Sequence, residues 1–382
     1  MGHTKAVDQL EKNTYEAKNF KRFYVPKTMV IYFSDCNLQI FEQFNKKIVE
    51  YTQFVQIGSI DKSVEQKRIN HFKQYFFPWL EFKNNEEKIM KPSAFFRTIG
   101  KELVKEIESL DLVIIVYKSN DVKVLDYVDE LSTILFKNDV FTFCFSVENF
   151  VQSEESKKRN KKLIKNLTKK RQVLVPIKEK SIVDAYKGAS ISNRTRYINS
   201  YINNLIDMFL APFLIPERNP DAFSKIKAIF YQNRKNFDSK IVSSIGYSDD
   251  KQNNVDIALI NALANPMFAA AFDTSNTFIV SVKMPFFLDY QLDRIKLILK
   301  SIVGEWKQFY VLTQIGSFDF TKYCQISIMA VNVDESKLIT DPEKIDEYIK
   351  KILNNIQKSK QIFEDDLTKD IILEKSINAL DS

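Results

Sequence analysis

The sequence predicts an α/β protein with two folded domains joined by one long helix. Its 382 residues are enough for two domains of ordinary size. In the first half, short continuous apolar runs alternate with helical patterns, which is typical of a parallel sheet covered on both faces. Near the middle of the chain, an unusually apolar helical pattern is followed by three closely spaced prolines. We therefore expect an α/β domain, a connecting helix and a second, smaller domain.

The first domain is expected over residues 25–196, after a polar arm at residues 1–24. Its buried strands are predicted at 28–33, 53–57, 112–117, 140–145 and 172–177. Helical patterns are found at 38–48, 95–107, 124–135 and in the basic segment 153–171. The aromatic-rich stretch at 62–92 shows no regular pattern. The alternation predicts a Rossmann-like parallel sheet.

The central helix and its exit loop are expected at residues 197–221. Four apolar residues recur at spacings of four, three and four, and so share one helix face: Ile198, Ile202, Leu205 and Phe209. Apolar residues also cover much of the remaining surface, which predicts a helix enclosed between two layers. Pro212 is expected to end the helix, and Pro216 and Pro220 to delay the next one.

The second domain is expected at residues 222–334, followed by a charged tail at 335–382. Strands are predicted at 226–231, 277–284, 306–314 and 323–333, and helices at 254–265 and 289–303. In the tail, Asp341-Pro342-Glu343 has the pattern of a helix start, with a cap, a first-turn proline and an acid near the positive end of the dipole. The tail carries eleven acids and eight bases beyond Asp334.

Composition excludes several classes of protein. No run of 18 apolar residues occurs, so no transmembrane segment is expected, and residues 1–21 lack the apolar core of a signal peptide. The three cysteines lie far apart, as in a protein with reduced thiols in the cytoplasm. The two histidines, His3 and His71, argue against a zinc site or a Ser-His-Asp triad, and no metal site is expected.

Glycine is scarce, and this limits how the chain could bind a nucleotide. The chain has seven glycines, no two of them close together, and neither G-x-G-x-x-G nor G-x-x-x-x-G-K-[ST] occurs. A phosphate-cradling loop needs closely spaced glycines so that backbone N–H groups can approach the phosphates. Conventional Rossmann and P-loop sites are therefore excluded.

The net charge of +7 is concentrated in the basic segment 153–171. Two acids, Glu154 and Glu155, accompany nine bases: Lys157, Lys158, Arg159, Lys161, Lys162, Lys165, Lys169, Lys170 and Arg171. A solvated helix face is the simplest interpretation, because no aromatic residue is interspersed among the bases. The alternative is an anionic partner, which could be nucleic acid, a membrane surface or an acidic protein.

Several short segments of the sequence resemble segments of the FtsZ/tubulin family. Lys161-Lys-Leu-Ile-Lys165 leading into Gln172-Val-Leu-Val-Pro176 is similar to that family's helix and strand ending in Ile-Pro-Asn, and Asp184-Ala-Tyr-Lys-Gly-Ala189 to its Asp-Ala-Phe-x-x-Ala. Asn265-Pro266-Met267-Phe268 resembles its Ser-Pro-Leu-Leu. Leu205-Ile206 and Pro212-Phe-Leu-Ile215 resemble the end of its central helix, with Ile226–Ile229 as the following strand.

The resemblance covers residues 28–333 and implies an FtsZ/tubulin-like fold. That fold has a Rossmann-like parallel-sheet N-terminal domain, a long central helix, a smaller α/β C-terminal domain and, here, a helical tail. In the family, glycine-rich turns bind GTP. The positions that correspond to the nucleotide site are Ser34, Asp35, Cys36, Lys118, Ser119, Asn120 and Tyr186. Both phosphate loops lack glycine, and Asp35 and Asp121 would repel phosphate.

The family also uses two acids after the central helix to activate water at the next subunit's nucleotide. Ala222 and Lys225 occupy those positions, with Asp221 one residue away, so no catalytic residue is expected. This exit loop is expected either at a head-to-tail contact or in a plain interdomain turn. Its predicted interface residues are Pro216, Glu217, Arg218, Asn219, Pro220, Asp221 and Lys225.

The resemblance and its departures together predict a bacterial, FtsZ-like cytoskeletal or cell-division protein, a pseudo-GTPase that acts as a filament subunit or accessory scaffold. No cofactor is expected. The expected partners are a second copy, head to tail, or FtsZ-type division proteins, in the cytoplasm, at the division site or at a membrane through partners. One alternative is a working GTPase with a rebuilt GTP/GDP site. Another is a basic adaptor that binds nucleic acid or an anionic membrane.

Overall fold

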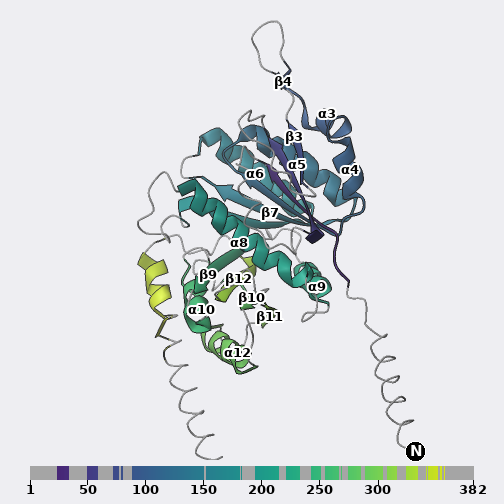
Figure 1. Cartoon of the computed structure of the whole chain (residues 1–382). Coiled ribbons are helices and arrows are strands. Elements are labelled where there is room, and N and C mark those ends of the chain that lie inside the picture. The colour runs from purple at the N-terminus through teal and green to yellow at the C-terminus, as the bar shows by residue number, and fades with distance from the viewer. Residues whose placement is uncertain are drawn as a thin grey trace, which may run out of the picture.

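The structure is a computed structural model of the whole chain (Figure 1). The residues it describes are 24–33, 50–58, 72–76, 79–80, 88–149, 152–180, 182, 194–214, 221–232, 242–250, 254–265, 268, 274–284, 289–303, 308–315, 324–333, 341, 343–351, 353–354 and 357.

The N-terminal half contains a parallel sheet. Its strands are β1 (Thr28–Phe33), β2 (Thr52–Gly58), β3 (Phe72–Phe76), β6 (Leu112–Lys118), β7 (Phe141–Glu148) and β8 (Val173–Lys178), in the order β3-β2-β1-β6-β7-β8. A separate two-stranded sheet joins β4 (Trp79–Leu80) to β5 (Lys88–Ile89). The four long apolar runs predicted as strands are confirmed, and so is the shorter one at β2.

Helices cover both faces of this parallel sheet. One face carries α3 (Pro92–Arg97), α4 (Lys101–Ile107), α5 (Val122–Lys137) and α6 (Glu154–Lys169); the other carries α8 (Arg194–Leu214) and α9 (Ala222–Gln232). Side chains alternate along each strand, so Val113 and Ile115 pack in the first core whereas Ile114 and Val116 pack against α8. Both sets are completely or almost completely buried, which accounts for the uninterrupted apolar runs.

The C-terminal half continues the same sheet. Strands β9 (Val242–Asp250), β12 (Cys324–Val333), β10 (Thr277–Met284) and β11 (Gln308–Ile315) follow β8 in that order. Among the described residues, one register pair, Leu174 with Val242, joins β8 to β9. Helices α10 (Val255–Leu263) and α12 (Asp289–Val303) cover the outer face. The described residues form ten strands in one sheet, with α8 between its two halves (Figure 1).

The tail begins with the predicted helix. Asp341 accepts a hydrogen bond from the backbone N of Glu343 at 3.1 Å, and helix follows from residue 343. Tyr348 packs against the C-terminal core, so this helix docks on the body of the protein. No helix in the described part of the chain is long and apolar enough to cross a membrane.

Helix α8 is enclosed between two layers, as predicted. From Tyr201 to Leu214 every residue is buried except Asn204, and the apolar ones contact both the parallel sheet and the C-terminal strands. Pro212 does not end the helix, contrary to the prediction, because the helix continues to Leu214. The missing N–H of Pro212 leaves the Met208 carbonyl without its helical donor, and Ser281 Oγ of β10 donates to it at 2.8 Å.

Other elements also differ from the sequence prediction. Residues 226–231, predicted as a strand, belong to α9, where Ala222, Phe223, Ile226, Ile229 and Phe230 form one buried helical face. The helix predicted at 95–107 is two helices separated at Thr98–Gly100, where the backbone N of Gly100 donates to Phe95 O at 2.9 Å. A Cβ at Gly100 would lie 3.1 Å from the Phe96 ring. Strands β3 and β9 were not predicted.

Polar contacts hold α8 in register with both layers. Lys283 Nζ of β10 donates to Asp207 Oδ2 at 2.8 Å, and both side chains are at most 10% exposed. Asn265 Nδ2 donates to the Tyr201 hydroxyl at 3.1 Å, and the Tyr32 hydroxyl of β1 donates to Asn203 Oδ1 at 2.9 Å. Each of these bonds satisfies a polar group that would otherwise be buried at a cost.

We predict that Asp207→Ala destabilises the protein strongly, by about 3–5 kcal/mol, because it leaves the Lys283 ammonium buried without its counter-charge. The double variant Asp207→Leu/Lys283→Met should be far more stable than this single variant. Urea unfolding followed by circular dichroism measures both. Lys296→Ala is the control, since its pair with Asp293 is exposed and worth at most about 1 kcal/mol. A single variant as mild as this control would contradict the prediction.

Candidate functional site

A pocket opens at the carboxyl ends of β1, β6 and β7, beside α8. The sheet order reverses between β1 and β6, and such switch points in parallel sheets are where ligands usually bind. The pocket contains about 330 Å³ of empty space, including space open to solvent. It is lined by Tyr32, Phe33, Val116, Tyr117, Lys118, Val147, Ile198, Asn199, Ile202 and Asn203.

Helix α8 supplies one wall of this pocket through two apolar and two amide side chains. Ile198, Asn199, Ile202 and Asn203 lie on one helix face because they are spaced one and four residues apart. Asn203 is 1% exposed, and its Oδ1 accepts from the Tyr32 hydroxyl. Tyr32, Asn199 and Asn203 were not among the site residues predicted from the sequence. Two asparagines four residues apart in an apolar helix were the available signal.

Lys118 to Asp121 form the turn between β6 and α5, where the resemblance expects a phosphate loop. Lys118 reaches the pocket and is partly exposed, and Asn120 is exposed. Ser119 is fully buried: its backbone N donates to Val147 O at 2.9 Å, and its Oγ accepts from Gln152 Nε2 at 2.6 Å. These bonds tie the turn to the end of β7.

Asp121 caps the first turn of α5. Its Oδ1 accepts from the backbone N of Lys123 at 3.0 Å and from that of Val124 at 3.2 Å. Free N–H groups at a helix N-terminus are the donors that would hold a phosphate. Here the chain's own carboxylate occupies two of them, and its negative charge opposes a second anion at the same place.

Other predicted nucleotide positions lie outside the described residues. These are Ser34, Asp35, Cys36 and Tyr186. The same holds for the predicted interface residues Pro216, Glu217, Arg218, Asn219 and Pro220.

The two positions that carry acids in the resembling family lie on α9. Ala222 is buried in the main core, 4% exposed, whereas Lys225 is exposed on the first turn. Asp221 is exposed just before the helix, with a φ of 79° that aspartate tolerates better than most residues, and its carbonyl accepts from the backbone N of Lys225 at 2.9 Å. Of these three residues, Asp221 alone carries a carboxylate.

The nine bases of segment 153–171 are divided by the structure. Lys157 pairs with Glu154 on its own helix, Arg159 with Asp126 of α5, and Lys170 with Asp129 of α5. Five lysines lie exposed on the outer side of α6, and we call them the lysine face: Lys158, Lys161, Lys162, Lys165 and Lys169. Arg171 is exposed beyond the helix end with a φ of 59°.

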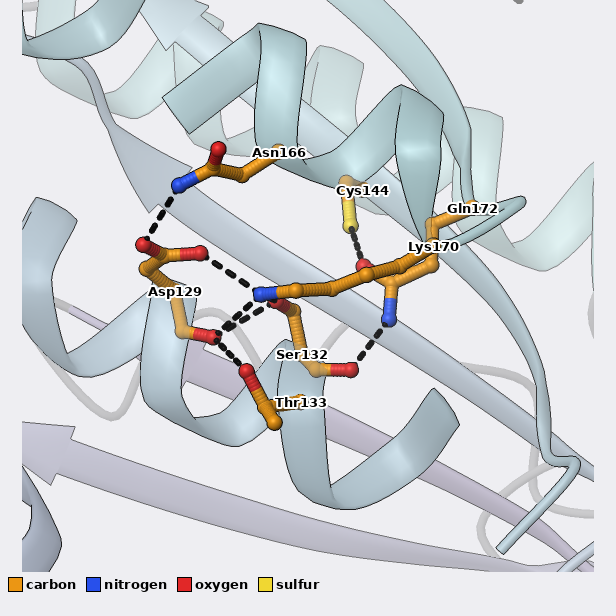
Figure 2. Close-up of polar contacts among 7 residues, drawn as sticks. All are labelled: Asp129, Ser132, Thr133, Cys144, Asn166, Lys170 and Gln172. Carbon is orange, nitrogen blue, oxygen red and sulfur yellow. Dashed lines mark hydrogen bonds and ion pairs between the residues drawn. The ribbon is translucent and has the colours of Figure 1, made fainter. Parts of the chain in front are cut away.

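Lys170 is the centre of a polar network that joins α5 to α6 (Figure 2). Its Nζ donates to Asp129 Oδ1 at 2.7 Å, to Asp129 O at 2.9 Å and to Ser132 Oγ at 2.7 Å. Asn166 Nδ2 donates to Asp129 Oδ2 at 2.8 Å, and Gln172 Nε2 to Ser132 O at 2.8 Å. Lys170 therefore serves packing, although the sequence analysis grouped it with the bases of a partner surface.

Cys144 lies at the buried end of this network. Its Sγ is 3.7 Å from Gln172 Oε1, and burial raises the pKa of its thiol, an effect that the nearby charge of Lys170 only partly offsets. A buried thiol with a raised pKa is a poor nucleophile, since the thiolate is the reactive form. Among the described residues, no three His, Cys, Asp or Glu side chains gather as metal ligands.

No protein-family model and no curated protein sequence matches this chain. Solved structures do match. An empty FtsZ dimer from M. jannaschii is 12% identical, with a TM-score of 0.64 over 87% of this chain and 98% of that one. GDP-bound CetZ1 from Haloferax volcanii is 11% identical, with a TM-score of 0.54 over 87% and 99%. A GTPγS-form TubZ protofilament from Bacillus thuringiensis serovar israelensis is 11% identical, with a TM-score of 0.53 over 94% and 98%.

The chain therefore has the FtsZ/tubulin-like fold that the sequence resemblance predicted. The likeness covers nearly the full length of each of these structures. It includes the Rossmann-like parallel sheet, the central helix α8 and the smaller C-terminal half.

We predict that Asp121→Ala lowers the free energy of unfolding by about 1 kcal/mol, because two N–H groups of α5 lose their acceptor. Asp121→Asn should cost less than half as much, since asparagine is also a good cap. Thermal or urea unfolding of the three proteins measures this. Asn120→Ala, one residue earlier and exposed, is the control and should change stability little. Equal losses for alanine at 120 and 121 would contradict the assigned cap.

Lys170→Met should destabilise the protein by about 1–3 kcal/mol, because Asp129 and Ser132 lose a partly buried donor. Lys169→Met removes the same charge from the lysine face and should stay within about 0.5 kcal/mol of the parent. Urea midpoints of the two variants test this difference. If they coincide, the network does not fasten α5 to α6.

Proposed function

We propose that this chain is an FtsZ-like cytoskeletal subunit that assembles head to tail without hydrolysing GTP. Similarity to an FtsZ dimer and a TubZ protofilament supports self-association. A heterologous head-to-tail contact generates an open filament without any chemistry. It acts either as the filament itself or as a scaffold for other FtsZ-type or division proteins.

The observation that carries the absence of GTP chemistry is the cap at Asp121. The donors that would cradle a phosphate at the switch point already hold a carboxylate. The second support is Ala222, which is a buried core residue and has no group that could polarise water. The third is the sequence itself, since neither loop position carries a glycine.

A GTP-binding protein with a rebuilt site is the second candidate, and the switch-point pocket favours it. That pocket has an aromatic wall, two amide side chains and the cation of Lys118, which together could hold a nucleoside or its phosphate. GDP-bound CetZ1 shares the fold. In this case Asp121 would have to release the α5 N-terminus before a phosphate could bind there.

Electron microscopy and sedimentation of the purified full chain, with and without GTP, test the proposal. Filaments of equal yield in both conditions are expected, with no nucleotide released on acid denaturation and no phosphate release above background. Filaments that require GTP would reject the proposal in favour of the rebuilt site. No filaments in either condition would favour the basic adaptor.

The charge of Lys225 tests whether the exit of α8 lies at the contact between subunits. Lys225→Glu reverses a charge on the exposed first turn of α9 and should raise the critical concentration for assembly roughly threefold. Lys300→Glu makes the same change on α12 and should leave it unaltered. Equal effects of the two substitutions would mean that the α8 exit is not at the contact.

A further inference from the structure

The lysine face of α6 is a one-sided cluster of unpaired positive charge. Four of its members, Lys158, Lys162, Lys165 and Lys169, are spaced three or four residues apart and so project from one side of the helix, and Lys161 lies next to Lys162. That side is opposite the buried one, which is formed by Ser156, Asn160, Leu163 and Leu167. All five are exposed, and within the described part of the chain no carboxylate pairs with any of them.

The other bases of the same helix show where the fold itself supplies acids. Arg159 and Lys170 turn toward α5 and meet Asp126 and Asp129 there, while Lys157 meets Glu154. Among the described residues, no acid pairs with a lysine on the outward side. Like charges at these spacings repel one another, and the helix tolerates them because its inner side and the Lys170 network hold it in place. A bound anion would relieve that repulsion.

The chain contains a segment of opposite charge at its C-terminal end. Residues 361–382 include six acids and two lysines, a net charge of −4. Asp366, Asp370 and Glu374 are spaced four apart, the same interval as Lys158 to Lys162 and Lys165 to Lys169. Opposite charges repeating at the same interval can meet in several adjacent pairs rather than in one.

This segment is tethered to the described tail helix by a short length of chain. The last described residue is Gln357, and the acids from Glu364 to Glu374 lie 7 to 17 residues beyond it. An extended chain of that length spans about 25–60 Å. A tethered segment is held at an effective concentration in the millimolar range, so weak exposed pairs suffice to populate the contact.

The composition of the lysine face favours an acidic segment of protein over a lipid surface or a nucleic acid. It presents no apolar side chain that would insert into a lipid surface and no aromatic ring on which a base would stack. Its cations are all lysines, and it lacks the planar guanidinium groups that are favoured for recognition of nucleic acid.

We propose that the lysine face of α6 binds the acidic C-terminal segment 361–382 of the same chain. This contact is separate from the switch-point pocket and from the exit of α8. It does not depend on the proposed function.

Carbodiimide cross-linking of the full chain tests the contact, because it joins lysine amines to carboxylates that touch. Mass spectrometry should find peptides that link the lysine face to residues 364–374. Mixing ¹⁵N-labelled with unlabelled protein separates the two sources. Links of uniform isotope composition are expected, and mixed-isotope links, which join two copies, would overturn binding within one chain. Raising the salt to 1 M should suppress the links, since it shortens the screening length to about 3 Å.

Charge reversal at Lys158, Lys162, Lys165 and Lys169 to glutamate should lower the yield of links from Lys161 about tenfold, as expected for the loss of four exposed pairs. The matched control reverses four exposed lysines elsewhere: Lys101, Lys105, Lys137 and Lys300. It makes the same change in net charge and should leave the links in place. Adding Asp366→Lys, Asp370→Lys and Glu374→Lys to the first variant should restore contact, now through tail lysines and α6 glutamates.

The proposal is overturned if the parent protein shows no links between the lysine face and the segment, or if the control set abolishes them equally. It is also overturned if the full chain binds phosphatidylserine vesicles or a DNA oligonucleotide through these lysines while the links are absent. Failure of the charge-swapped protein to recover links would likewise count against it, provided that its circular dichroism spectrum matches the parent's.

Discussion

The structure depends on one constraint, which is that α8 must be buried over most of its surface and still satisfy its polar groups. Two layers contact the helix, so each polar atom on it needs a partner from one layer or the other. Asn203 finds Tyr32 in the parallel sheet, and Asp207 finds Lys283 in the C-terminal strands. Met208 O, freed by Pro212, finds Ser281. These partners fix how the two halves meet, because in the described part of the chain the sheet itself joins them through one register pair.

The sequence predicted most of the fold where one pattern dominated. Strands such as β6 are buried on both faces and therefore read as continuous apolar runs, and α8 was recognised by its breadth of apolar coverage. Short apolar runs were ambiguous. Residues 226–231 suit a strand by composition, but the buried side continues from Ala222 at helical spacing, and burial against the main core decided the outcome.

The candidate site was less predictable, because it depends on pairings between distant residues. Sequence alone placed an aspartate where a phosphate loop was expected, and repulsion followed from its charge. Only the structure shows that Asp121 is also the cap of α5. In the same way, Lys170 and Lys169 look alike in the sequence, yet Asp129 on another helix makes one structural and leaves the other exposed.

The cap at Asp121 has a consequence for timing. Hydrolysis of a bound nucleotide makes the older subunits of a filament differ from newly added ones, because the terminal phosphate leaves and the loop that held it relaxes. A carboxylate attached to the backbone cannot leave. If the chain assembles as proposed, the N-terminus of α5 stays capped in the same way from assembly to disassembly. It therefore does not change with the time that a subunit has spent in the filament. Turnover would then be set by subunit concentration and by partners that bind its surface.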